Sequence, residues 1–129
     1  MQENEALVFM GHGTEHFANA VYPAMQTAFR LMNRPDVFLG TVEGWPSLDD
    51  CKKQLKYHGY PKAHLLPLML VAGDHAQKDM AGEQSSSWKS QLEAEGISIR
   101  CTMDGLGLLP EIQEIYVDHL SDLLAKSKG

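Results

Sequence analysis

Several features are scarce in this sequence of 129 residues, and each shortage excludes a class of protein. Its two cysteines, Cys51 and Cys101, are too few for a disulfide framework or a four-cysteine zinc site. No apolar run approaches the ~20 residues that a membrane-spanning helix needs. Basic residues number 11 against 17 acidic ones, and this net charge of −6 argues against a nucleic-acid partner held through its phosphates.

The rest of the composition is that of a folded domain. Hydrophobic residues make up 43% of the chain and charged residues 22%, which is ordinary for a globular protein. The length predicts one domain that buries roughly two thirds of its unfolded surface. The polar start of the chain and the short apolar stretch 6–10 do not resemble a secretion signal, which favours a cytoplasmic protein.

Short apolar runs alternate with segments of helical period along the whole chain. Strands are predicted at residues 6–10, 37–42, 64–71 and 97–103. Helices are predicted over 17–32, from the N-cap Ser47 to the stop at Gly59, partly over 74–87, and over 88–95 and 112–124. This order predicts a three-layer α/β/α, flavodoxin-like fold with a four-stranded, mainly parallel sheet.

The last predicted helix has the clearest apolar face, and His119 lies on it. We therefore expect His119 to be packed against the core or at its edge. Cys51 falls on an apolar helix face and Cys101 in a strand, so both are expected to be reduced, buried and inert. The apolar face of the last helix consists of Ile112, Ile115, Tyr116, His119, Leu120, Leu123 and Leu124.

Three residues that can bind a metal follow three of the predicted strands. His12 lies two residues past the first strand, Glu43 directly follows the second, and His75 lies four residues past the third. In open parallel sheets, ligands bind beyond the carboxyl ends of the strands. Two imidazoles and a carboxylate suit a first-row divalent metal and leave positions open for substrate. The sequence therefore predicts a metal site formed by His12, Glu43 and His75.

Each of these residues also has a simpler interpretation. The turn Gly11–Thr14 could cradle a phosphate at a helix start, Glu43 could be a solvated carboxylate, and His75 could merely follow a capping aspartate. His16 could line the same pocket as His12. The stretch from His12 to His16 also matches the H-x-x-E-H metalloprotease motif, which requires both histidines on one helix. The glycines around His12 place it before the helix, so we reject the protease interpretation.

Four stretches of this sequence form a recognisable set: Val8–Gly13, Val42–Glu43, Leu66–Ala76 with Asp79–Met80, and Gly105–Gly107. They resemble the anaerobic cobalt chelatases of the CbiK type, which are class II tetrapyrrole chelatases. The resemblance runs from about residue 7 to residue 125. It implies His12, Glu43 and His75 as metal ligands, with His12 and His75 as catalytic residues. The implied reaction is the insertion of Co²⁺ into sirohydrochlorin, a lyase-class step of cobalamin biosynthesis that uses no organic cofactor.

The resemblance is to one half of the usual protein. Members of this family typically have two similar lobes with the tetrapyrrole between them, and residues 1–129 resemble the C-terminal lobe. We therefore expect a homodimer, or an N-terminal lobe, to complete the cleft, and neither a nucleic acid nor a membrane span. Because the start of the chain then says little about targeting, a periplasmic location stays open beside the cytoplasm.

The sequence leaves alternatives for the metal that is inserted, for whether the lobe is catalytic, and for the groups that bind the substrate. The donor set also accepts Fe²⁺ and Ni²⁺, so a sirohydrochlorin ferrochelatase that leads to sirohaem is one alternative. A lobe that binds metal or tetrapyrrole without catalysis is another. Sirohydrochlorin carries many carboxylates although this chain is acidic, so local basic groups must bind them. Lys78 and Lys89, near the end of the third predicted strand, are the candidates.

Overall fold

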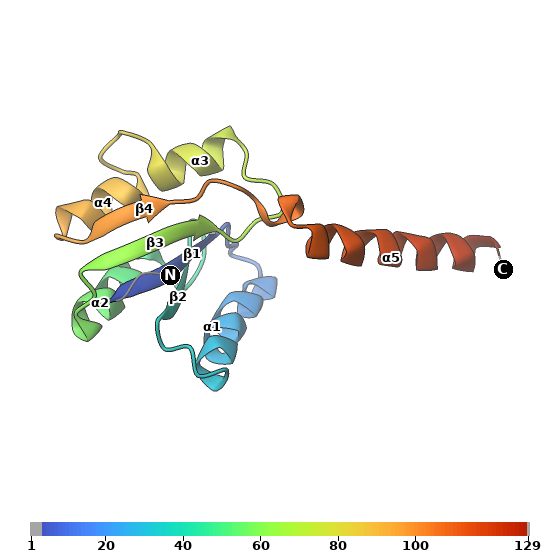
Figure 1. The fold of residues 1–129 in the computed structure, drawn as a ribbon, viewed down its shortest axis with the longest axis horizontal. Coiled ribbons are helices and arrows are strands. Elements are labelled where there is room, and N and C mark those ends of the chain that lie inside the picture. The colour runs from blue at the N-terminus through green and yellow to red at the C-terminus, as the bar shows by residue number, and fades with distance from the viewer. Residues whose placement is uncertain (1–3, 129) are drawn as a thin grey trace.

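A computed structural model describes residues 4–128, in which strands and helices alternate around one sheet (Figure 1). Residues 1–3 and 129, which belong to the expected lobe, lie outside this described part. The elements are β1 (Glu5–Gly11), η1 (Phe17–Ala20), α1 (Val21–Leu31), β2 (Val37–Thr41), α2 (Leu48–His58), β3 (Lys62–Pro67), α3 (Asp74–Ala81), α4 (Trp88–Ala94), β4 (Ser98–Cys101), η2 (Leu106–Leu108) and α5 (Pro110–Lys128).

The four strands lie in the order β2-β1-β3-β4, and every neighbouring pair is parallel. Helices α2, α3 and α4 cover one side of the sheet, and α1 lies on the other (Figure 1). The predicted three-layer α/β/α fold with a four-stranded parallel sheet is therefore confirmed. The fold places the carboxyl ends of all four strands along one edge.

One side of the sheet, which we call the closed face, carries the core. Ala6, Val8 and Met10 of β1 point to it and are fully buried. They pack with apolar side chains of the three covering helices, among them Leu55 and Leu92. Burying a side chain of this size contributes about 1.5–3 kcal/mol, so this face supplies most of the hydrophobic stabilisation.

The opposite side, which we call the open face, is covered only in part. Leu7 and Phe9 alternate with the buried residues of β1 and are only partly buried, as is Leu66 on the neighbouring strand. Helix α1 lies over the β2 side of this face, where the rings of Phe9 and Phe29 stack at 5.9 Å. The central strands β1 and β3 therefore have one fully buried side and one partly buried side.

The edge strand β2 is closed by a side chain. Gln26 of α1 donates from Nε2 to the carbonyl of Val37 and accepts at Oε1 from the amide of Leu39, at 2.9 and 2.8 Å. The amide side chain thus takes the hydrogen bonds that a further strand would make. This arrangement blocks strand addition at β2.

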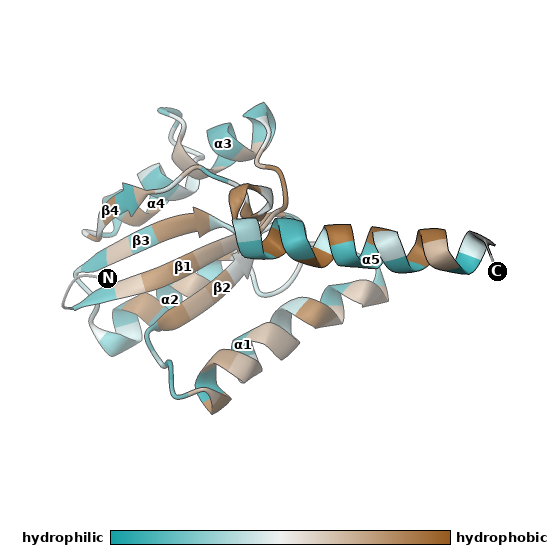
Figure 2. Ribbon diagram, turned by 45° about the vertical axis from the view of Figure 1, so that its right-hand side comes forward, coloured by the Kyte–Doolittle hydropathy of each residue, from teal (hydrophilic) through white to brown (hydrophobic). Residues whose placement is uncertain are grey.

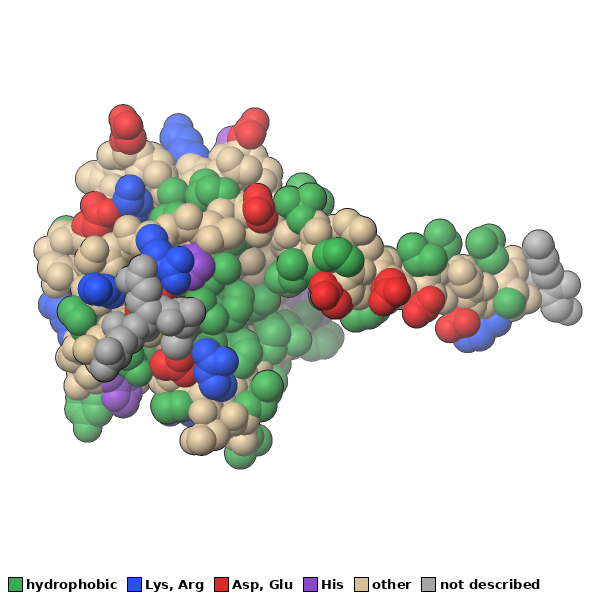
Figure 3. Space-filling view, in the orientation of Figure 1, with side chains coloured by type: hydrophobic (Ala, Val, Ile, Leu, Met, Phe, Trp, Pro, Cys, Tyr) green, Lys and Arg blue, Asp and Glu red, His purple; other side chains and the backbone are tan. Residues whose placement is uncertain are grey.

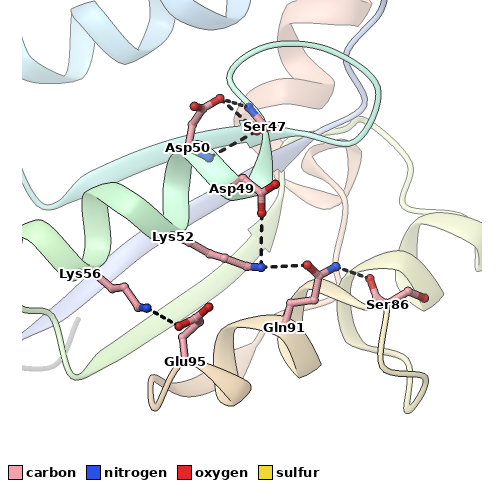
Figure 4. A network of polar contacts seen from close by, with 8 residues as sticks. All are labelled: Ser47, Asp49, Asp50, Lys52, Lys56, Ser86, Gln91 and Glu95. Carbon is pink, nitrogen blue, oxygen red and sulfur yellow. Dashed lines mark hydrogen bonds and ion pairs between the residues drawn. The ribbon is translucent and has the colours of Figure 1, made fainter.

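Helix α2 begins and ends where the sequence predicts. Ser47 accepts from the amide of Asp50, and the Asp50 carboxylate accepts from the amide of Ser47 at 2.9 Å, which forms a capping box. Gly59 ends the helix with φ of 72°, a left-handed conformation that suits glycine. Polar contacts from Lys52 to Gln91 and from Lys56 to Glu95 then join α2 to α4 and to the residue directly after it (Figure 4).

Three strands are shorter than predicted, β2 by a single residue, and one helix begins later. β3 ends at Pro67, which has no N–H to extend the ladder, whereas the apolar run predicted a strand to residue 71. β4 covers Ser98–Cys101 within the predicted 97–103. The segment predicted as one helix over 17–32 divides into η1 and α1, with Pro23 in the first turn of α1, where proline is tolerated.

Helix α5 corrects one prediction. Its apolar residues were expected to form a packed face, with His119 against the core, but α5 extends away from the sheet (Figure 1). His119 is exposed, and the large apolar side chains around it are half-exposed or more. The expectation is wrong because the sequence pattern shows that a face is suited to burial and does not show which surface buries it.

The two cysteines are both free thiols, as predicted. Cys51 is buried, and this burial raises the pKa of its thiol to about 12. Cys101 is only half-buried, which corrects the expectation of full burial, and its pKa is also raised by desolvation. Neither thiol is activated. In the described part of the chain, no helix is long and apolar enough to cross a membrane.

Candidate functional site

Two of the predicted ligands meet at the carboxyl edge of the sheet. His12 directly follows β1, and Glu43 lies two residues past β2. The Nδ1 atom of His12 is 3.6 Å from Oε2 of Glu43, and the two side chains are 66% and 63% exposed. The structure therefore brings these two residues together as predicted, and both are exposed to solvent, where a ligand can reach them.

The register of the parallel strands causes this meeting. Gly11 pairs with Thr41 at the last position of the β1–β2 ladder. The ladder continues beyond the strands, because the amide of Val42 donates to the carbonyl of Gly11 and the amide of Glu43 donates to the carbonyl of His12, at 3.0 and 2.8 Å. The backbones of His12 and Glu43 are thus tied together.

Asn19 binds the two loops of the site to each other. Its Nδ2 donates to the carbonyl of Trp45 at 2.6 Å, and its Oδ1 accepts from the amide of Thr14 at 3.1 Å. Gly13 lies between these loops with φ of 76°, and a Cβ there would come within 2.6 Å of the amide nitrogen of Gly44. Sequence reasoning missed Asn19, because no local pattern reveals a contact between loops 26 residues apart.

The surroundings of His12 favour one form of its ring. Nδ1 lies 3.1 Å from the carbonyl oxygen of Gly13 and also faces the carboxylate of Glu43. Two oxygen acceptors on this side favour the tautomer with its proton on Nδ1. The lone pair of Nε2 is then the one available to a metal, and Glu43 orients the ring as carboxylates do beside metal-binding histidines.

His75 does not join this pair. It is exposed in the first turn of α3, and because β3 ends at Pro67, eight residues separate it from the strand where the sequence predicted four. Within residues 4–128, no group of three or more His, Cys, Asp and Glu side chains can hold a metal ion. The prediction that His75 is a ligand stays a prediction.

The phosphate-loop alternative fits the structure poorly. A phosphate cradle needs free backbone N–H groups, but three of those after His12 have partners: Thr14 donates to Asn19, His16 to Thr14, and Ala18 to Nδ1 of His16. His16 therefore caps η1. His12 precedes η1 and His16 is its cap, so the two do not share one α-helical face, as expected.

Large apolar side chains surround the carboxyl edge, and sequence reasoning did not single them out. They lie after the ends of three strands and in η2, where loop residues are usually polar. Phe17 is 84% exposed, and its ring lies 4.0 Å from that of His16. Exposed apolar groups gathered on one edge are typical of a binding surface. The group comprises Phe17, Val42, Trp45, Leu70, Val71 and Leu108.

The two predicted carboxylate-binding lysines differ in their surroundings. Lys89 lies in α4 and pairs with Glu93 at 3.8 Å, so part of its charge is already balanced. Lys78 is exposed in α3, three residues after His75. Of the two, Lys78 has the better position beside the predicted site.

The fold and the site define a class: a parallel α/β protein with an exposed His–Glu pair and an apolar surface at the carboxyl edge of its sheet. Residues 1–125 match the family of cobalt chelatases (CbiK), and the chain belongs to that family. The resemblance inferred from the sequence motifs is thereby confirmed.

Two curated relatives are named as sirohydrochlorin cobaltochelatases. The protein of Salmonella typhimurium is 42% identical over 127 residues, which are 96% of this chain and 47% of that protein. The CbiKC protein of Nitratidesulfovibrio vulgaris is 40% identical over 118 residues, which are 92% of this chain and 42% of that protein. The chain thus spans less than half the length of both relatives.

A solved structure supports the fold. The CbiX protein of Marinobacter aquaeolei matches with a TM-score of 0.71 at 20% sequence identity. The match covers 95% of this chain and 98% of that one. A single lobe of this architecture therefore makes up nearly the whole of a solved chain.

Proposed function

We propose that residues 1–129 form one lobe of a sirohydrochlorin cobaltochelatase and take part in inserting Co²⁺ into sirohydrochlorin in cobalamin biosynthesis. The observation that carries this proposal is the exposed His12–Glu43 pair at the carboxyl edge of the sheet, 3.6 Å apart, in a chain of the cobalt chelatase family. The names of the two curated relatives supply the substrate and the metal.

The chemistry of metal insertion suits these side chains. A divalent metal replaces the two pyrrole N–H protons of the free macrocycle, so the lobe must deliver the metal and accept protons. Neutral imidazole does both near pH 7. In the proposal, Nε2 of His12 and the ring of His75 hold Co²⁺. As the metal passes to the macrocycle, the lone pair freed on one imidazole takes one pyrrole proton, and the other proton leaves to water. Glu43 orients His12 through Nδ1 in the metal-free lobe. It offsets part of the metal's charge, and its carboxylate must turn toward Nε2 to serve as the third ligand.

The exposed apolar side chains and Lys78 have a part in this proposal. A tetrapyrrole is a flat apolar ring with carboxylates on its rim. The rings of Phe17 and Trp45 offer it apolar contact area beside His12, and Lys78 offers charge to a carboxylate. A second lobe, from another copy of this chain or from an N-terminal lobe, closes the other side of the cleft. A cytoplasmic location, with the periplasm as alternative, stays a prediction.

The test is to mix the chain with sirohydrochlorin and Co²⁺ and to follow the absorption spectrum of the macrocycle against an enzyme-free control. Accelerated insertion supports the proposal. His12→Ala and His75→Ala should each abolish the acceleration without changing the circular dichroism of the chain. His58→Ala, at the end of α2, is the matched control and should keep full activity. Full activity in His12→Ala would refute the assigned role.

The same assay separates two alternatives. Fe²⁺ and Ni²⁺ suit the same donors, and insertion rates measured with the three metals in competition distinguish a cobaltochelatase from a ferrochelatase. The second alternative is a lobe that binds without catalysis, which the short span of the chain relative to both relatives favours. Tight Co²⁺ binding without insertion would support that alternative.

A further inference from the structure

The His12 side of the carboxyl edge is poor in basic side chains. The two loops there, residues 11–20 and 42–47, contain neither lysine nor arginine, and the first basic residue of α1 is Arg30. Their acidic side chains are Glu15 and Glu43. At this edge, Figure 2 shows hydrophobic residues in the ends of β1 and β3, and Figure 3 shows hydrophobic side chains where the body of the molecule meets α5. A substrate carboxylate on this side therefore needs an uncharged hydrogen-bond donor.

His16 lies in the first of these loops and is held by three hydrogen bonds. Its amide donates to Oγ1 of Thr14 at 3.1 Å, and its carbonyl accepts from the amide of Asn19 at 2.9 Å. Its ring Nδ1 accepts from the amide of Ala18 at 3.1 Å. The ring centroid also lies 4.0 Å from that of Phe17, with 36° between the two planes. These contacts fix both the backbone and the ring of an exposed residue.

The contact with Ala18 decides the chemistry of the His16 ring. Because an N–H donates to Nδ1, this nitrogen carries a lone pair, and the proton of the neutral ring is on Nε2. Within the described residues, Nε2 of His16 has no hydrogen-bond partner. His12 has the opposite arrangement, since its Nδ1 faces two oxygen acceptors and its Nε2 carries the lone pair. The two histidines are thus suited to different tasks: His12 can bind a metal, and His16 can donate a hydrogen bond.

We propose that His16 binds a peripheral carboxylate of the tetrapyrrole by donating a hydrogen bond from Nε2, while the ring of Phe17 contacts the macrocycle beside it. This inference rests on the proposed function and assigns a substrate-binding residue to it. Phe17 is 84% exposed, so an apolar ring lies next to a fixed donor, which matches a flat macrocycle with carboxylates on its rim. A charged acceptor strengthens such a hydrogen bond.

The same geometry excludes two other roles for His16. A metal ligand and a general base both need a free lone pair on a ring nitrogen. The lone pair on Nδ1 is taken by the amide of Ala18, and Nε2 carries the proton. His16 therefore acts on the substrate and not on the metal, although it lies four residues after His12.

Nitrogen NMR of the histidine rings tests the first step without metal or substrate. Above the ordinary titration range of histidine, the ¹⁵N-labelled chain should show His16 with its proton on Nε2 and His12 with its proton on Nδ1. The variant His16→Asn assigns the signals by removing one set. A proton on Nδ1 of His16 would overturn the proposal.

Fluorescence titration with metal-free sirohydrochlorin tests the second step. His16→Asn keeps an acceptor for the cap, since asparagine is a preferred N-cap residue, and removes Nε2–H. It should bind sirohydrochlorin roughly 10-fold more weakly, as expected for a lost hydrogen bond to a charged group, with unchanged circular dichroism and Co²⁺ affinity. His16→Asp also keeps the cap but adds a like charge, and should bind more weakly still. His58→Asn, at the end of α2, is the matched control and should bind as the wild-type chain does.

Fully methyl-esterified sirohydrochlorin separates carboxylate binding from apolar contact. The wild-type chain and His16→Asn should bind this ester with the same affinity. An equal loss on the ester and on free sirohydrochlorin would reduce His16 to a structural cap and overturn the inference. Equal binding of free sirohydrochlorin by both proteins, or a weaker Co²⁺ affinity in His16→Asn, would also overturn it and leave the proposed function standing. No binding of sirohydrochlorin by the wild-type chain would instead overturn the proposed function, and this inference with it.

Discussion

The two faces of the sheet are built from alternate residues of the same strands, yet they differ in completeness. On β1, Val8 is fully buried under the helices of the closed face, while Leu7 and Phe9 on the open face are only partly buried. The closed face is completed by segments that follow in the same chain. Among the described residues, the open face has α1 as its covering helix, and the remaining apolar helix, α5, points elsewhere (Figure 1). The difference shows that the core of this chain depends mainly on the closed face.

The largest expected effect on stability comes from two adjacent leucines on β3, because one lies on each face of the sheet. Leu65 is fully buried on the closed face, so Leu65→Ala should lower the free energy of unfolding by about 2–5 kcal/mol at any protein concentration. Leu66→Ala, on the partly buried open face, should cost less. Denaturant titrations measure both losses. Equal losses would contradict the distinction between the faces.

The loops at the carboxyl edge depend on polar contacts instead of apolar burial. Asn19→Ala removes two hydrogen bonds between the loops that carry His12 and Glu43, and each contributes about 0.5–1.5 kcal/mol. We expect a modest loss of stability and a Co²⁺ affinity lower by roughly 10-fold, since residues that orient a ligand have effects of this size. Denaturant titration and calorimetry check the two effects. An unchanged affinity would show that Asn19 does not position the pair.

The open face also contains a polar group that responds to pH. His64 donates or accepts a 2.7 Å hydrogen bond with Oγ1 of Thr102, and its pKa is lowered from 6.5 by partial burial and by the charge of Arg100, with Glu5 opposing. Because the folded pKa lies below the unfolded one, stability should fall as the pH drops below 6.5, until it passes the folded pKa. His64→Asn should flatten this dependence. Thermal unfolding between pH 5 and 8 measures it, and identical slopes would contradict the assignment.

The smallest effect is expected on the outer side of the closed face. Lys56 of α2 pairs with Glu95 at the end of α4, and this pairing lowers the pKa of the Glu95 carboxyl (Figure 4). Both groups are solvated, so Lys56→Ala should hardly change the unfolding midpoint, and added salt should remove the difference. A large loss that persists in high salt would mean that polar contacts, and not the apolar core, hold these helices on the sheet.

The sequence predicted the parts of the fold that depend on local patterns. The capped helix from Ser47 to Gly59 and the four strands were found because their signals lie within a few residues. The meeting of His12 with Glu43 also followed, because the carboxyl ends of neighbouring parallel strands share an edge.

Other features could not be predicted because they depend on contacts between distant segments. The apolar run 64–71 gave no sign that its strand ends at Pro67, so His75 lies eight residues past the strand and not four. The role of Asn19 depends on a loop 26 residues away. The direction of α5 depends on the bonds that hold η2, and the pattern of α5 itself shows only which of its sides is apolar.

The central functional claim is that His12, oriented by Glu43, binds the metal, and a Co²⁺ titration tests it without a second lobe or a tetrapyrrole. The visible absorption of bound Co²⁺ is followed in the wild-type chain, His12→Ala and His58→Ala. The account predicts binding in the wild-type chain and in His58→Ala, and at least a 10-fold weaker affinity in His12→Ala. Equal Co²⁺ affinity in all three proteins would contradict it.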